Sequence, residues 1–200
     1  MRYIVQKTNM TDPDAYSAEW EIADIGRISE QNWHGYCTSP ETIFKMLRGP
    51  EGISILMHTK EKNLRSQCTL QNGEVCRDSC MEFFFKPNPW DERYINFEIN
   101  PDGVMHVGIG VNRYGRVLDD TDRAVFNVQS VPNDGDWILK FYIPDLFLLT
   151  HFEKIAKVCK ANFYKCGNDT DHPHYGAWSP VEVERPDFHL PDFFGTIEFA

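Results

Sequence analysis

Short runs of alternating apolar and polar residues dominate this chain, and most of them are closed by Gly, Pro, Asn or Asp. Alternation with a period of two is typical of β-strands that bury one face. The pattern predicts strands at Thr42–Leu47, Ile53–Thr59, Met81–Lys86, Tyr94–Asn100, Val104–Val111, Ala124–Val131, Trp137–Ile143, Ala161–Cys166 and Gly195–Phe199. A weak helical pattern is confined to Asp145–Lys157.

Strands at this spacing, without βαβ alternation, predict an all-β fold. We expect two antiparallel sheets packed face to face as a β-sandwich of the immunoglobulin-like or jelly-roll type, with little helix. A chain of 200 residues that is 42% hydrophobic can bury one sizeable core, so residues 1–200 are expected to form a single domain. The segment Gly167–Pro191 lacks periodicity and is expected to be one long loop, and loops of that length are usually functional.

Charge and composition exclude several classes of partner. The formal net charge is −10 and no basic stripe is present, so nucleic acid and anionic membranes are poor partners. No stretch is long enough to span a bilayer, and the first residues lack a signal-peptide core, so we expect a cytoplasmic protein, or an extracellular one if a signal was removed. The six cysteines have no CxxC or zinc-ribbon spacing, which favours free, partly buried thiols over disulfides.

One face of three predicted strands carries polar residues. Successive side chains of a strand point to opposite faces, so the apolar residues of each strand mark its core side. If Met81–Lys86, Tyr94–Asn100 and Val104–Val111 are neighbours, the opposite face carries Glu82, Tyr94, Asn96, Glu98 and His106. Such groups can hydrogen-bond the hydroxyls of a sugar, while aromatic rings cover its apolar face. An ordinary solvated sheet face is the alternative.

The long predicted loop is rich in aromatic side chains. His172, His174, Tyr175 and Trp178 crowd into a polar, irregular segment. A tryptophan there is costly to expose without a purpose, which suggests a platform for stacking a sugar ring. The alternative is that Trp178 is tucked over the edge of the sandwich.

Two blocks of the chain have a distinctive sequence. The first is Asp78–Phe85 with Pro87 and Tyr94–Gly103, and the second is Phe163–Gly167, His174–Pro180, Pro186–His189 and Phe193–Gly195. Both blocks resemble the carbohydrate-binding modules of family 9, as found in endo-1,4-β-xylanases, and Trp20, Ile28 and Trp33 fit the family's opening more loosely. The resemblance implies a β-sandwich that binds the chain ends of xylan- or glucan-type saccharides without catalysis, and that often carries structural calcium. It names no calcium ligands in this chain.

The resemblance also implies roles for particular residues. Trp178 matches the C-terminal stacking tryptophan, Glu82 the acidic ligand, Asn96 a polar amide, and Tyr175 a further polar contact. The family's other tryptophan has no counterpart in the segment 74–77, and we expect Trp90 to substitute for it. This interpretation requires the polar face and the ring of Trp178 to converge on one concave site.

Three alternatives stay open. Glu82 and Glu98 could be the carboxylate pair of a glycoside hydrolase, which would make the protein an enzyme. Cys166, His172 and His174 could hold a transition metal, because His-x-His spacing places two imidazoles on one side of an extended segment. A protein-interaction domain of the same architecture is the third, since a fold does not fix a function.

Overall fold

The computed structural model describes all 200 residues and is built almost entirely from strands. They are β1 (Arg2–Lys7), β2 (Gly26–Ile28), β3 (Thr42–Arg48), β4 (Gly52–Thr59), β5 (Cys80–Lys86), β6 (Tyr94–Ile99), β7 (Met105–Gly110), β8 (Arg116–Leu118), β9 (Gln129–Asn133), β10 (Asp136–Pro144), β11 (Val158–Gly167), β12 (His174–Ala177) and β13 (Gly195–Phe199). One α-helix, α1 (Asp145–His151), and four short 3-10 turns complete the chain. The single helix is not long and apolar enough to cross a membrane.

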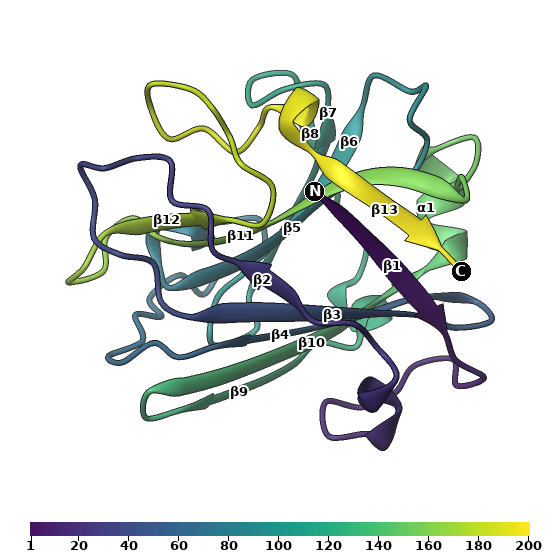
Figure 1. Ribbon diagram of the computed structural model, residues 1–200, viewed down its shortest axis with the longest axis horizontal. Coiled ribbons are helices and arrows are strands. Elements are labelled where there is room, and N and C mark those ends of the chain that lie inside the picture. Colours follow the sequence, from purple (N-terminus) through teal and green to yellow (C-terminus); the bar gives the residue numbers. More distant parts are fainter.

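The strands form two layers that one strand joins. Sheet A has the order β8-β7-β6-β5-β11-β13, with β12 beside β11, and sheet B has the order β3-β4-β10-β9, with β2 beside β3. β1 pairs in parallel with β13 on one side and with β3 on the other, and therefore links the two sheets into one curled surface (Figure 1). The predicted all-β class is confirmed, and the curled mixed sheet is consistent with a β-sandwich. The prediction of purely antiparallel sheets is wrong at β1, because local alternation carries no information on which distant strand will pair with it.

Aromatic rings fill the space between the sheets. From sheet A, Phe83, Phe97 and Phe163 point inward, and Phe163 stacks on Phe44 of sheet B with the ring centroids 3.6 Å apart. These residues alternate along their strands with residues that face the other way, as the period of two requires. The layer between the sheets is the main hydrophobic core.

The outer face of sheet A is buried as well. A second apolar cluster covers it, built from sheet residues and from the C-terminal segment. Tyr164 of β11 stacks on Phe188 with a centroid separation of 4.0 Å, and Phe84 of β5 packs against Phe194. The C-terminal segment therefore acts as a partial third layer over sheet A and encloses what would otherwise be an open sheet surface.

Several predicted element boundaries need correction. The strand predicted at Ala124–Val131 is wrong in its first half, because residues Arg123–Phe126 form a 3-10 turn that ends at Asn127 with φ 41°. The predicted helix ends at His151, earlier than expected. The predicted loop Gly167–Pro191 contains β12, which pairs with β11. Most other predicted strands are confirmed to within three residues at each end, whereas β1, β2 and β8 were not predicted.

Candidate functional site

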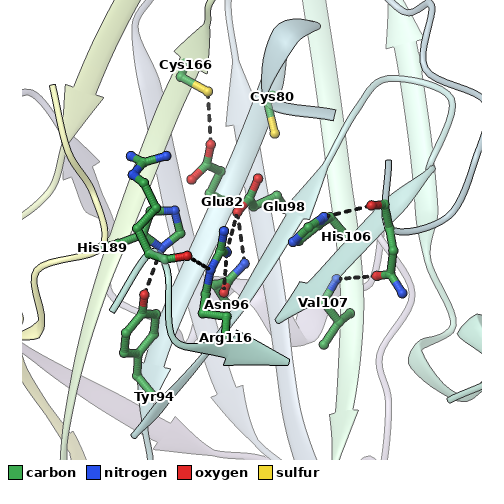
Figure 2. Close-up of polar contacts among 12 residues, drawn as sticks. Cys80, Glu82, Tyr94, Asn96, Glu98, His106, Val107, Arg116, Cys166 and His189 are labelled. Carbon is green, nitrogen blue, oxygen red and sulfur yellow. Dashed lines mark hydrogen bonds and ion pairs between the residues drawn. The ribbon is translucent and has the colours of Figure 1, made fainter. Parts of the chain in front are cut away.

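The register of sheet A brings a row of polar side chains together. Glu82 of β5 lies directly opposite Glu98 of β6, and Glu98 lies opposite His106 of β7 (Figure 2). This confirms the predicted polar face. The face is not solvated, however, since Glu82 is only 2% exposed and Glu98 is also buried. Buried carboxylates need partners, so the surroundings of this row decide its chemistry.

A cavity of about 300 Å³ opens over this row. Its floor comes from sheet A, and its walls come from the segment before β5, the β7–β8 connection and the C-terminal segment. The lining residues are Asn72, Gly73, Glu74, Cys76, Glu82, Glu98, His106, Arg113, Arg116, Cys166, Asn168, Tyr175, Pro186, Phe188 and His189. Acidic, basic and aromatic groups therefore face one small volume.

Arg116 organises the polar groups on one side of the cavity. Its Nη1 donates to Asn96 Oδ1 at 2.9 Å and lies 3.4 Å from Glu98 Oε1. Asn96 Nδ2 in turn donates to the same Glu98 oxygen at 2.9 Å (Figure 2). Glu98 thus has a guanidinium and an amide as partners, which compensates its burial.

Gly108 makes room for this network. It lies opposite Asn96 in the sheet, on the outward parity of β7. A Cβ at this position would stand 2.9 Å from Asn96 Oδ1 and 3.3 Å from Arg116 Nη1. The absence of a side chain therefore allows the guanidinium of Arg116 to pass close over the sheet.

Glu82 has a very different environment from Glu98. Its only hydrogen bond is with Cys166, whose Sγ donates to Glu82 Oε1 at 2.9 Å. Burial, followed by the nearby charge of Glu98, raises the pKa of Glu82 to about 8. Glu82 therefore offers the cavity a carboxyl group whose hydrogen-bonding capacity is largely unused.

Two histidines border the cavity, and one of them has a ring nitrogen without a partner. The Nδ1 of His106 lies 3.2 and 3.3 Å from the backbone oxygens of Asn72 and Gly73, so the proton sits on Nδ1 and Nε2 is left as an acceptor without a partner. His189 Nδ1 is hydrogen-bonded to the hydroxyl of Tyr94 at 2.8 Å. Burial, with the charges of Arg116 and Arg113 adding to it, lowers the pKa of His189, which keeps this ring neutral.

The expectation for Trp178 needs correction. Its side chain is 5% exposed and packs in the main core, edge-on to Phe44 and Phe163. Ala177 lies opposite Tyr164, whose side chain is on the outer face, so the next residue along the chain points between the sheets. Trp178 and the polar row thus lie on opposite faces of sheet A, and the predicted convergence of the two does not occur.

The other predicted site residues separate into three groups. Glu82 and Tyr175 line the cavity. Asn96 is fully buried and acts through its contacts with Arg116 and Glu98. Trp90 is 77% exposed beyond the far end of β5, with the ammonium of Lys154 4.5 Å from its ring centroid, and it does not line the cavity.

The predicted transition-metal set does not assemble. Cys166 faces the cavity, whereas His174 points to the other side of sheet A, where its Nε2 lies 3.0 Å from Lys165 Nζ. The side chains whose ligand atoms do converge are Cys80, Glu82 and Cys166. Two sulfur atoms do not suit a hard cation such as calcium. Calcium therefore stays a prediction that rests on the resemblance alone.

Some cavity residues were missed in the sequence. Arg113, Arg116 and Phe188 come from segments without regular alternation. One signal could have found the arginines, because His106, Gly108 and Gly110 share the outward parity of one strand and the two glycines leave space above it. The segment that follows this strand was the natural candidate to fill that space.

Comparison with known proteins identifies the family of this chain. The sequence model of carbohydrate-binding family 9 matches residues 16–199. The chain therefore belongs to carbohydrate-binding family 9. No curated protein matches the sequence significantly.

Solved structures share the fold of this chain. A candidate carbohydrate-binding protein from Bacteroides uniformis has a TM-score of 0.85 and 28% identity, with 100% of this chain and 99% of that chain covered. A family 9 module from Caldicellulosiruptor kristjanssonii in complex with glucose has a TM-score of 0.70 and 11% identity, with 100% and 96% covered. The structure of such a module from the same organism with cellotriose has a TM-score of 0.69 and 12% identity, with 100% and 94% covered.

Proposed function

We propose that this protein binds the end of a saccharide chain, without catalysis, in the cavity over sheet A. The observation that carries the proposal is the buried pair Glu82 and Glu98 facing one cavity of about 300 Å³ beside Arg116. A volume at the lower end of the range for small-molecule sites suits one or two sugar rings rather than a long chain. A cavity of this size therefore suits the end of a saccharide chain.

The cavity offers the hydrogen-bonding groups that a sugar needs. Glu82 and the free Nε2 of His106 supply acceptors for hydroxyl protons, and Arg113 and Arg116 supply donors for hydroxyl oxygens. Tyr175 and Phe188 provide aromatic surface on the cavity wall. Since Trp178 is in the core, these two rings take the stacking role in the proposal.

Relatives guide the choice of ligand. Family 9 modules from Caldicellulosiruptor kristjanssonii have been solved with glucose and with cellotriose. We therefore propose glucose-type ligands, with xylose-type ones as the comparison, because the two differ by the exocyclic group that a small cavity must accommodate. The sugar whose exocyclic group fits the cavity should bind more tightly.

Calorimetric titration with glucose, cellotriose, xylose and xylotriose tests this proposal. At pH 7 the raised pKa keeps the Glu82 carboxyl largely protonated, and a hydrogen bond between neutral groups contributes roughly 0.5–1.5 kcal/mol, so Glu82→Gln is expected to weaken the binding of the preferred sugar about two- to tenfold. Glu92→Gln is the matched control, because Glu92 is an exposed carboxylate between β5 and β6 and away from the cavity. No heat with any of the four sugars, or equal affinity in Glu82→Gln and Glu92→Gln, would contradict the proposal.

One observation favours a second function. Side chains directly opposite each other on antiparallel strands have their Cβ atoms roughly 4.5–5.5 Å apart, and Glu82 and Glu98 are such a pair. Retaining glycosidases need two carboxyl groups about 5–5.5 Å apart, one of them protonated. Slow release of nitrophenol from aryl glycosides, abolished in Glu82→Gln and retained in Glu92→Gln, would establish hydrolysis. Absence of turnover leaves binding alone.

A further inference from the structure

Two sulfur atoms and one carboxylate oxygen meet at the floor of the cavity. Cys80 and Glu82 lie two residues apart on β5, and Cys166 lies directly opposite Cys80 on the neighbouring strand β11. All three side chains are buried, and their two sulfur atoms and one carboxylate oxygen lie within 4.8 Å of one another (Figure 2). The two-residue spacing of Cys80 and Glu82 on β5 places both side chains on one face of sheet A, and the pairing of Cys166 with Cys80 places the third on the same face.

We propose that Cys80, Glu82 and Cys166 form a binding site for a borderline-soft divalent cation of the Zn²⁺ class. Zn²⁺ binds thiolate sulfur at about 2.3 Å and carboxylate oxygen at about 2.0–2.2 Å. Two ligands of a tetrahedral ion then stand roughly 3.5–3.8 Å apart, so rotation of side chains is enough to close the observed arrangement around an ion. Two thiolates favour this class of ion over Ca²⁺ or Mg²⁺.

The partners of the three groups do not satisfy them. The Cys166 thiol donates to Glu82 Oε1, Cys80 Sγ has a long contact of 3.9 Å with the oxygen of Met81, and the two thiols interact with each other. Glu82 receives no hydrogen bond from a backbone N–H or from an arginine, unlike Glu98 beside Arg116. A buried carboxyl group with one thiol as its partner leaves most of its bonding capacity unused, and a cation at this position supplies the missing interaction.

The surroundings suit the charge and the geometry of such a site. An ion with two thiolates and one carboxylate carries a net charge of −1, and Arg113 and Arg116 line the same cavity. Binding releases the protons of the two thiols and of the Glu82 carboxyl group to solvent. Glu82 and Cys166 also line the cavity, so the fourth coordination position faces it and is left to water or to a ligand hydroxyl. The donors stand on two adjacent strands of sheet A, which holds them in place.

Titration of the reduced protein with Co²⁺ tests this inference without any sugar. We expect one equivalent to bind, with thiolate-to-cobalt charge-transfer absorption in the near ultraviolet and the visible bands of tetrahedral Co²⁺, both removed when Zn²⁺ is added. Cys80→Ser should weaken binding by more than roughly 100-fold, because loss of even an outer partner of a metal ligand costs 10–100-fold. Cys159→Ser is the matched control, since Cys159 is equally buried but faces the main core.

Two outcomes overturn the proposal. One is a wild-type protein that gives no charge-transfer band at equimolar Co²⁺, and the other is an unchanged spectrum in Cys80→Ser. If Cys80→Ser does not fold, Cys80→Ala removes the same ligand atom and serves the same comparison.

The test separates this inference from the proposed sugar binding, with which it shares Glu82. Cys80 does not line the cavity. In buffer that contains a chelator, Cys80→Ser should bind glucose with the wild-type affinity. A cobalt spectrum without glucose binding contradicts only the proposed function, and glucose binding without a cobalt spectrum contradicts only the metal site.

Discussion

The two faces of sheet A bury their side chains by different physical means. The inner face carries Phe83, Phe97 and Phe163, which pack ring against ring with the residues of sheet B. The outer face carries Glu82 and Glu98, which are the sequence neighbours of Phe83 and Phe97 on the same strands. Loops cover both carboxyl groups and bury them. Packing needs only shape and apolar area, whereas a buried carboxylate needs a specific partner. The inner face is therefore complete in itself, and the outer face leaves groups free for a ligand.

The largest effect is expected from the tryptophan on the inner face. Trp178→Ala should lower the free energy of unfolding by about 3–5 kcal/mol, because it leaves a cavity in a close-packed core. Chemical denaturation measures this loss. The folded fraction should keep its affinity for sugar, since the ring does not reach the cavity. A stable Trp178→Ala protein that no longer binds sugar would reverse the assignment of the two faces.

One cluster of polar side chains is buried at the edge of the otherwise apolar inner face. His174, Lys165 and Glu61 form a buried cluster there, with Lys165 Nζ 2.8 Å from Glu61 Oε2. Burial, followed by the charge of Lys165, lowers the pKa of His174 to about 4. The unfolded chain, with an ordinary histidine pKa near 6.5, then binds the proton more readily than the folded one. Stability should therefore fall as the pH drops from about 6.5 to about 4.

The expected loss over that range is about 3 kcal/mol, from roughly 1.4 kcal/mol per pKa unit. Denaturation curves of wild type and His174→Gln at a series of pH values measure it. The variant should show a flatter dependence on pH, and His34→Gln, which changes an exposed histidine, should follow the wild type. Parallel curves for all three proteins would rule out His174 as the titrating group.

The outer face should tolerate added volume poorly. Gly108→Ala places a methyl group against Asn96 and Arg116 and should cost about 1–3 kcal/mol of stability, a range typical of overpacking. Sugar affinity should fall as well, because Arg116 has to move. Gly35→Ala is the matched control, since nothing lies within 4 Å of the added atom. If the two variants bind sugar equally well, Arg116 does not organise the site.

The smallest effect is expected from the tryptophan outside both faces. Trp90→Ala should change the free energy of unfolding by less than about 1 kcal/mol, which is the scale of an exposed cation–π contact such as that with Lys154. Calorimetry should show unchanged sugar affinity. A clear loss of affinity would restore Trp90 as a binding residue and would mean that the ligand extends well beyond the cavity.

The fold was largely predictable and the site only in part. Alternation along β5, β6 and β7 identified both faces of sheet A, and with them Glu82, Asn96, Glu98 and His106. It could not show that the polar face is covered, because the cover comes from Phe188 and its neighbours far along the chain. Trp178 was misplaced for a related reason, since β12 is too short for its parity to be recognised in an irregular segment.

Local sequence determines which residues of a strand share a face, because side chains alternate with a fixed period of two. That rule alone separated the aromatic residues of the core from the carboxylates of the site. Tertiary structure decided which strands are neighbours, which loops close over them, and that Cys80, Glu82 and Cys166 meet at one point. Those arrangements depend on contacts between segments that are distant in the chain, and no local sequence pattern predicts the free energy of such contacts.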